Sequence, residues 1–463
     1  MRTKRQAIEK TPQRAGQGEA PEAKLMGAEV LMAKREGENL AGNERLMEEI
    51  VSRENLRKAL QRVKSNGGAP GVDKMTVKEL PEYLKTNWLT IKEQLLSGSY
   101  QPQPVRRVEI PKPEGGVRKL GVPSVLDRFI QQSVMQVLQA KWDETFSEYS
   151  YGFRPGRSAH QAVKQAQRYV QAGYTIVVDI DLEQFFDRVN HDRLMAGIAE
   201  RVKDKRVLKL IRAFLNSGVM ENGLATASAE GVPQGGPLSP LLSNLVLDEL
   251  DQELTKRGHR FVRYADDANV YVRSRKAGER VMASITRFIT GRLKLKVNEA
   301  KSAVDRPQNR KLLGFSFTKS NRRSLAPKTI ERFKTRVRKE TSRTGGKSLK
   351  QVIARLKRYI MGWIQYFGIA QLKKDFDTLD SWVRHKLRCM VWKQWGTRRK
   401  RYQELRKRGV RPYTAWVTMK SGHGPWRLSR SPGVTQALGA KLFAALGLPS
   451  LTELSALSSR RTA

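Results

Sequence analysis

Residues 261–272, FVRYADDANVYV, alternate apolar and polar side chains on either side of two adjacent carboxylates. Successive side chains of a strand point to opposite faces, so Val262 and Tyr264 fall on the same face of an extended chain. The alternation predicts two antiparallel strands of a buried hairpin with Asp266 and Asp267 at its tip. Asp tolerates the left-handed backbone that tight turns require, so turn propensity alone explains an isolated acidic pair.

A second acidic stretch, TIVVDIDLEQFFDRVNH at residues 175–191, begins as a β-branched strand. It carries Asp179 and Asp181 two positions apart, hence on one face. Buried carboxylates must be paired or bind metal. One strand acid and two acids at a turn tip could hold two Mg²⁺ ions roughly 4 Å apart, the arrangement for in-line displacement at phosphorus. Strand geometry leaves open which of the two strand acids is the ligand.

The chain is strongly basic, with 88 Lys and Arg against 45 Asp and Glu. Such a charge attracts polyanions, because Lys and Arg displace counterions from phosphates. Residues 321–420 hold 29 Lys and Arg but only 6 Asp and Glu, and six of the eight Trp residues lie beyond residue 360. A charge run alone is usually a solvated face, whereas cations interleaved with aromatics favour contact with RNA or DNA. Composition by itself leaves a ribosomal or chromatin-packing protein as the alternative.

The chain has 463 residues, 39% of them hydrophobic, which is enough for about three domains with real cores. Strand-like and helix-like segments mix without a regular βαβ alternation, which favours an α+β fold. Residues 1–45 predict a segment that is mobile until it meets a partner. The single Cys389 excludes a disulfide within the chain and favours a reducing compartment. No stretch approaches the about 18 apolar residues of a membrane span, so we expect a cytoplasmic protein without membrane contact.

The two acidic stretches and several further blocks resemble the reverse transcriptases encoded by bacterial group II introns. The blocks span most of the chain in the family's order: LRKALQRVKSNGGAPGVD, VRRVEIPKPEGGVRKLGVPSVLDRFIQQSV, YSYGFRPGRSAHQAV, VDIDLEQFFD, GVPQGGPLSPLLSNLVLDELD, YADD, LKLKVNEAKSAV, LLGFSF and YIMGWIQYFGIA. The resemblance implies a right-hand fold, with fingers and an antiparallel palm sheet at 46–320. An α-helical thumb or maturase domain at 321–395 and a small basic DNA-binding segment at 396–463 would follow.

The resemblance also selects the metal ligands. In these enzymes the metal-binding Asp precedes by five positions an aromatic residue that lies against the sugar of the incoming nucleotide. Phe186 therefore points to Asp181, and leaves Asp179 as a supporting or structural acid. The implied metal site consists of Asp181, Leu182 through its carbonyl, Asp266 and Asp267. Two Mg²⁺ ions, with Mn²⁺ as a substitute, are the implied cofactors, and the bulk of Phe186 would exclude a 2′-hydroxyl, so that the product is DNA.

The implied nucleotide-binding residues are Lys112, Arg118, Phe186, Gln234 and Lys301. Lys112 and Arg118 stand around a Gly pair in IPKPEGGVRK, where a guanidinium and an ammonium suit a triphosphate and an ordinary charged hairpin is the alternative. Gln234 matches the residue that contacts the incoming nucleotide. Lys301 matches a Lys proposed to protonate the pyrophosphate leaving group, and on sequence alone it is equally a surface Lys.

Two loops before predicted helices complete the set of site residues. Arg154 and Arg157 would hold phosphates of the template RNA, with ion pairing inside the loop as the alternative. Ser158 and Gln161, which follow them, form a capping box pattern. Farther along, Ser239 before Pro240 is typical of a helix N-cap followed by the first turn.

The implied function is an RNA-directed DNA polymerase that copies intron RNA into cDNA and binds its group II intron RNA, as a ribonucleoprotein, to assist splicing and retrohoming. Its further partners would be dNTPs, a DNA primer and a DNA target at the bacterial nucleoid. The ending resembles that of compact class C members, which lack the HNH endonuclease domain, and Cys389 alone cannot supply the cysteine pairs of that domain. The alternatives are a reverse transcriptase of DNA repair or phage defence without an intron, and a splicing-only maturase. The sequence does not distinguish a monomer from a dimer.

Overall fold

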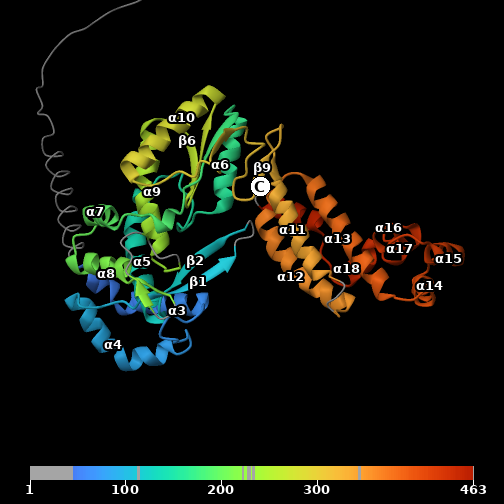
Figure 1. Cartoon of the computed structure of the whole chain (residues 1–463), viewed down its shortest axis with the longest axis horizontal. Coiled ribbons are helices and arrows are strands. Elements are labelled where there is room, and N and C mark those ends of the chain that lie inside the picture. The colour runs from blue at the N-terminus through green and yellow to red at the C-terminus, as the bar shows by residue number, and fades with distance from the viewer. Residues whose placement is uncertain are drawn as a thin grey trace, which may run out of the picture.

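The protein consists of a mixed helix and sheet body followed by an elongated helical body (Figure 1). The computed structural model describes residues 45–111, 115–221, 224–226, 231, 235–342 and 346–461. Lys112, Gln234 and almost all of the predicted mobile segment 1–45 lie outside these ranges. The α+β class and the helical C-terminal region predicted from the sequence are confirmed.

Helices make up most of the first body. They are α2 (Leu46–Ile50), α3 (Arg53–Asn66), α4 (Leu80–Ser97), α5 (Val125–Trp142), α6 (Ala159–Gln171), α7 (His191–Arg201), α8 (Lys205–Asn216), α9 (Ser239–Lys256) and α10 (Arg275–Phe288), with short turns η1 (Asp143–Thr145), η2 (Phe185–Asp187) and η3 (Ile289–Leu293). The predicted capping box of Ser158 and Gln161 opens α6. Helix α9 starts at Ser239 itself, with Leu238 in the cap position, so the predicted N-cap is displaced by one residue.

One sheet of the first body has the strand order β2-β1-β4-β5. Strands β1 (Val105–Pro111) and β2 (Val117–Val122) form an antiparallel hairpin, which is the predicted hairpin around the Gly pair. Strand β4 (Val219–Glu221) runs parallel to β1 and pairs antiparallel with β5 (Leu224–Thr226).

The second sheet has the order β6-β7-β3-β8 and is antiparallel throughout. Its strands are β3 (Ile176–Ile180), β6 (Arg260–Tyr264), β7 (Asp267–Val272) and β8 (Ala303–Asp305). Alternation along these strands divides the side chains between two cores. Val177 and Val262 join the core that includes α6, whereas Val178 and Phe261 join the core that includes α9 and α10. The predicted antiparallel sheet with the acidic hairpin is confirmed.

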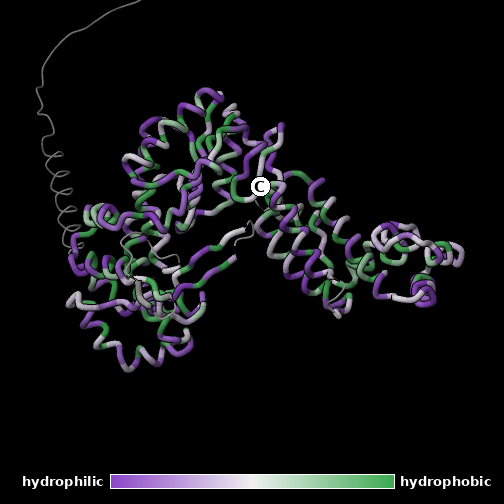
Figure 2. Tube along the Cα trace, viewed as in Figure 1, coloured by the Kyte–Doolittle hydropathy of each residue, from purple (hydrophilic) through white to green (hydrophobic). Residues whose placement is uncertain are grey.

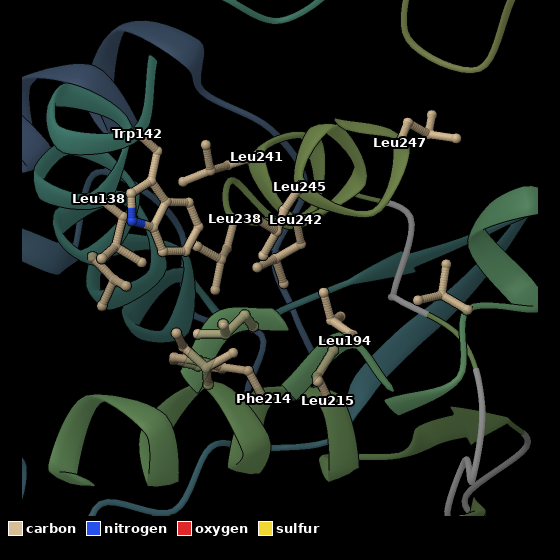
Figure 3. Close-up of a cluster of buried hydrophobic side chains, with 14 of the residues drawn as sticks. Leu138, Trp142, Leu194, Phe214, Leu215, Leu238, Leu241, Leu242, Leu245 and Leu247 are labelled. Carbon is tan, nitrogen blue, oxygen red and sulfur yellow. The ribbon is translucent and has the colours of Figure 1, made fainter. Parts of the chain in front are cut away.

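Leucines of α9 form the centre of the first core (Figure 3). Leu238, Leu241, Leu242 and Leu245 lie within about two helical turns and are at most 6% exposed. Figure 3 shows them facing Leu138 and Trp142 of α5 and Phe214 and Leu215 of α8. This spacing buries one side of α9 in the core. Asp251 and Asn244 of the same helix accept hydrogen bonds from Arg263 of β6, and these contacts fix α9 against the sheet.

The second body follows a small sheet of β9 (Phe315–Phe317) and β10 (Arg323–Leu325). Its helices are α11 (Pro327–Glu340), α12 (Leu349–Phe367), α13 (Lys373–Gln394), α14 (Arg398–Lys407), α15 (Pro412–Lys420), α16 (Pro425–Leu428), α17 (Pro432–Ala437), α18 (Ala440–Ala445) and α19 (Leu451–Arg461). Helix α19 packs back against α12 and α13. None of the helices in the described ranges is long and apolar enough to cross a membrane.

The tryptophans of the second body range from buried to exposed, and Trp382 is half-buried. Trp363, Trp392 and Trp395 are buried in the helical core, as core packing predicts. Trp416 and Trp426 are 47% and 44% exposed. Figure 2 shows α14 as a hydrophilic helix, in keeping with its sequence RRKRYQELRK. Cations lie over aromatic rings along the second body, from Lys334 and Arg338 over Trp382 to Lys420 over Trp416.

Candidate active site

The acidic hairpin turns on two residues, with Tyr264 of β6 paired to Asp267 of β7. Ala265 has a φ of +57°, so the left-handed residue is an alanine rather than an aspartate, contrary to the turn argument from sequence. A positive φ costs a non-glycine residue free energy unless its surroundings impose it. Gly152 packs directly behind this turn, because an added Cβ would lie 2.3 Å from the Ala265 nitrogen.

The buried side chain of Arg263 stabilises this turn. Its guanidinium is 1% exposed and lies 2.5 to 3.0 Å from the carboxylate oxygens of Asp251. It also donates to the Asn244 side chain at 3.0 Å and to the carbonyl of Ala265 at 2.9 Å. The N–H donors of Arg263 thus bind two side chains of α9 and the backbone of the turn. These bonds explain how Ala265 is kept in a left-handed conformation.

Asp181 is the first residue after β3, and β3 pairs with β7 of the hairpin. Its backbone is fixed on both sides, because Asn298 donates to its carbonyl at 2.8 Å and its own N–H donates to the Ser302 hydroxyl at 3.0 Å. The next residue, Leu182, is buried and forms a β-bridge with Val297. The carboxylate of Asp181 lies 3.6 Å from the ammonium of Lys301.

A cavity of about 690 Å³ brings part of the predicted site together, although Asp267, Arg154 and Arg157 are not among its lining residues. Its walls include six of the predicted residues: Arg118, Asp181, Leu182, Phe186, Asp266 and Lys301. Phe186 is half-buried and packs edge-on against Phe185, with ring centres 5.2 Å apart. Arg118 extends from β2 and is exposed. Residues from four separate stretches of the chain therefore meet at one opening.

The acids of the hairpin tip lie in an unfavourable environment for negative charge. Desolvation by the surrounding protein raises the pKa of Asp266, and repulsion from Asp181 adds to the increase. Asp267 remains in contact with solvent, yet desolvation and the charges of Asp266, Asp179 and Asp181 raise its pKa to about 6. No hydrogen bond or ion pair joins the Asp267 carboxylate to another side chain of the described ranges. The cluster holds more negative charge than the nearby cations balance.

Asp179 differs from its neighbours because it is paired. Arg310 donates to one of its oxygens at 2.6 and 2.9 Å, and Asn269 of β7 donates to the other at 3.0 Å. The same guanidinium donates to the backbone carbonyl of Lys301 at 2.5 Å. These contacts fit the supporting role expected for Asp179. Arg310 was missed from the sequence, because it stands in the irregular stretch DRPQNRK, where no periodicity or motif marks it.

The donor set suits a hard divalent cation. Carboxylate oxygens are the ligands that Mg²⁺ prefers, and an excess of negative charge would be relieved by a cation. No group of three His, Cys, Asp or Glu side chains within the described ranges is already arranged as a finished metal site. Asp181, Asp266 and Asp267 therefore fit such an ion by chemistry and proximity rather than by preformed coordination.

The two arginines predicted to hold the template RNA have different surroundings. Arg154 is 8% exposed, and its guanidinium is engaged by Asp143 and by the carbonyls of Ser147 and Ser150. These contacts favour the alternative of ion pairing inside the loop for Arg154. Arg157 is half-buried, donates to the carbonyl of Glu148 at 3.1 Å and lies over the ring of Tyr151.

The flanks of the stretch GVPQGGP that surround Gln234 lie beside the cavity, although Gln234 itself is outside the described ranges. Gly231 is close to Phe186, because an added Cβ would lie 3.1 Å from the Phe186 carbonyl oxygen. An added Cβ on Gly235 would lie 2.5 Å from the carbonyl oxygen of Gly121, the penultimate residue of β2. The absence of a side chain thus permits Gly231 to approach η2 and Gly235 to approach the β1–β2 hairpin.

Comparison with known families matches both bodies. Residues 110–317 match the reverse transcriptase (RNA-dependent DNA polymerase) family, and residues 330–409 match the group II intron maturase-specific domain. The first match contains the acidic hairpin and β3, and the second begins in α11 and ends after α14.

Curated relatives agree with these matches. Protein YkfC of Escherichia coli is 40% identical over 220 residues, which are 46% of this chain and 58% of that protein. The group II intron-encoded protein LtrA of Lactococcus lactis is 40% identical over 161 residues, 35% of this chain and 27% of that protein. The putative COX1/OXI3 intron 2 protein of Saccharomyces cerevisiae is 37% identical over 155 residues, 33% and 18% of the respective chains. The chain thus spans less than two thirds of each of these relatives. In this chain a region similar to reverse transcriptases therefore precedes a region similar to the group II intron maturase-specific domain.

Proposed function

We propose that the chain is an RNA-directed DNA polymerase that also binds a group II intron RNA and assists its splicing and mobility. The observation that carries the polymerase proposal is the under-compensated carboxylate cluster, of which Asp181 and Asp266 line one cavity with Phe186, Arg118 and Lys301, while Asp267 adjoins Asp266 at the hairpin tip. Buried negative charge without a partner is costly, and it is retained where catalysis uses it.

In this proposal Asp181, Asp266, Asp267 and the Leu182 carbonyl hold two Mg²⁺ ions, or Mn²⁺ in their place. Bound there, the ions would supply activation of a primer 3′-hydroxyl and stabilisation of the leaving pyrophosphate. Arg118, with Lys112, orients the triphosphate of the incoming dNTP. Lys301 lies beside Asp181, where its ammonium can donate a proton toward the leaving group.

Phe186 supports the choice of DNA as product, because its half-buried ring forms part of the cavity wall just beyond Asp181. We expect Phe186→Ala to retain polymerisation and to admit ribonucleotides, since the smaller side chain leaves room for a 2′-hydroxyl. Single-nucleotide incorporation with dNTP and rNTP measures the ratio. An unchanged preference for dNTP would remove this role from Phe186, and Phe185→Leu, a change in the adjacent buried ring, controls for general loosening.

The remaining assignments of the chain follow the family. We propose fingers and palm at 46–320, a thumb or maturase domain at 321–395 and a DNA-binding segment at 396–463. The basic outer surface of the helical body suits A-form RNA, which proteins recognise through shape and backbone contacts. The partners would be the intron RNA in a ribonucleoprotein, dNTPs and a DNA primer and target, in the bacterial cytoplasm and at the nucleoid.

Primer extension on an RNA template, with and without Mg²⁺, tests the polymerase, and splicing of a group II intron at low Mg²⁺ tests the maturase. We expect the chain to extend the primer only with the metal and to accelerate splicing. Extension without any effect on splicing would favour a repair enzyme without an intron. Splicing assistance without extension would favour a splicing-only maturase.

A further inference from the structure

A pocket rich in arginines lies at the opposite end of the acidic hairpin. It has a volume of about 470 Å³, and its lining includes Tyr174, Arg257, Arg260, Arg273, Arg280 and Ser284. We call this group the arginine pocket. Arg260 begins β6, so at about 3.3 Å per residue it lies about 17 Å from the turn at Ala265. The arginine pocket is therefore separate from the candidate active site.

The positive charge of this pocket is largely uncompensated. No Asp or Glu belongs to its lining. Arg257 is neutralised by Glu253, with nitrogen and oxygen 2.6 Å apart, and also donates to Ser284. Across the described ranges no carboxylate lies within ion-pair distance of Arg260, Arg273 or Arg280. Three guanidinium groups from β6, the end of β7 and α10 thus face one hollow without a counter-charge.

The pKa of Tyr174 reflects the positive electrostatic potential of the arginine pocket. A hydrogen bond from Arg260, aided by the charges of Arg260 and Arg273, lowers the pKa of its phenol. The guanidinium of Arg273 lies over its ring, 5.3 Å from the centroid. Because a guanidinium covers one face of that ring, the pocket favours binding of an anion over stacking of a base.

We propose that the arginine pocket binds consecutive backbone phosphates of the structured RNA that the protein accompanies, an inference that rests on the proposed function. Arginine forks match phosphate oxygens, and their spread over several elements suits a polymer better than one triphosphate. Contacts to phosphates position a nucleic acid without reading its bases, which agrees with the covered tyrosine ring. Structured RNA is recognised largely in this way.

The test compares a triple variant, Arg260→Gln, Arg273→Gln and Arg280→Gln, with the unaltered full chain. A charge-matched control carries Arg53→Gln, Arg57→Gln and Lys78→Gln, which change exposed cations of α3 and the turn before α4, at the other end of the first body (Figure 1). Binding of a folded group II intron RNA is measured over a range of salt concentrations. The same measurement with duplex DNA distinguishes the two nucleic acids, and thermal unfolding checks that each variant folds.

We expect the pocket variant to bind the RNA roughly thirtyfold to a hundredfold more weakly at about 150 mM salt, with the slope of log affinity against log salt reduced by about 2 to 3. Primer extension on a short template should change less than twofold, because the pocket lies outside the catalytic cavity. An unchanged slope, an equal loss in the control variant, or a loss confined to duplex DNA would each overturn the inference. Failure of the unaltered chain to extend any primer would instead count against the proposed polymerase.

Discussion

Two acidic groups beside the acidic hairpin, Asp251 on helix α9 and the pair at the hairpin tip, have opposite electrostatic surroundings. Asp251 is fully buried but is matched by Arg263, which fills its donor fork with that carboxylate and the adjacent turn. Asp266 follows Arg263 by only three residues, yet among the described residues neither Asp266 nor its neighbour Asp267 has such a partner, and the pKa values of both are raised. The ion pair of Asp251 and Arg263 stabilises the fold, whereas the unpaired carboxylates of Asp266 and Asp267 are suited to binding a cation. Variants that neutralise one group or the other test this distinction.

The largest effect is expected for Asp266→Asn. Loss of one metal-binding carboxylate should cost about 4 kcal/mol of transition-state stabilisation, roughly a thousandfold in rate. Stability should be unchanged or slightly higher, because one like charge is removed from the cluster. Single-turnover primer extension and urea unfolding measure the two quantities. Glu299→Gln, which removes an exposed carboxylate close to Lys301, is the matched control and should change the rate less than threefold. Near-normal extension by Asp266→Asn would refute the assignment.

Arg263→Met addresses the matched pair and should act mainly on stability. It leaves the Asp251 carboxylate buried without a counter-charge, which costs about 3 to 5 kcal/mol of unfolding free energy. Adding Asp251→Leu should recover a large part of this loss, because two apolar side chains then fill the space of the ion pair. Urea unfolding of both variants measures the recovery. A loss below about 1 kcal/mol for Arg263→Met would mean that the pair does not stabilise the fold as its geometry indicates.

Asp179 is intermediate between the paired Asp251 and the unpaired Asp266, because it lies in β3 close to the acidic cluster but forms an ion pair with Arg310. We expect Arg310→Gln to slow extension roughly tenfold to a hundredfold, the range seen when residues that orient metal ligands are removed. The cause is twofold: Asp179 loses its counter-charge beside Asp267, and the Lys301 carbonyl loses its donor.

A double variant separates the two causes. If the unmatched charge dominates, Asp179→Asn in the Arg310→Gln background restores most of the rate and returns the Mg²⁺ requirement toward that of the unaltered chain. Arg306→Gln, which removes an exposed arginine four residues earlier, should have little effect. If Arg310→Gln leaves both the rate and the Mg²⁺ requirement unchanged, Arg310 does not position the site.

The sequence was most informative where the signal was local. Alternation over FVRYADDANVYV predicted the hairpin and the division of its side chains between two faces, because a strand repeats every two residues. The family spacing to Phe186 singled out Asp181, and both residues line the same cavity. The Ser158 and Gln161 pattern likewise contains its own partners and was confirmed.

Long-range pairing could not be predicted in the same way. The partner of Arg263 is twelve residues away on α9, and the partner of Asp179 is 131 residues away. A single sequence carries no signal for such contacts. The left-handed residue was assigned to aspartate by propensity, yet Gly152 and Arg263 impose that conformation on Ala265 from outside the hairpin. Tertiary contacts thus overruled the local preference.

The smallest effect concerns pH and the unmatched cluster. The pKa of Asp267 is about 6 in the folded chain and 3.8 for an ordinary Asp, so between these values the folded state binds more protons than the unfolded state. Without metal, stability should therefore fall as pH rises through this window and become level above about pH 6. Extension should show the opposite trend and decrease as the pH falls, because protons compete with the metal for the Asp267 carboxylate. Asp267→Asn should abolish this part of the stability profile, as followed by thermal unfolding from pH 4 to 8 in chelator. An identical profile in the variant would show that another group titrates there.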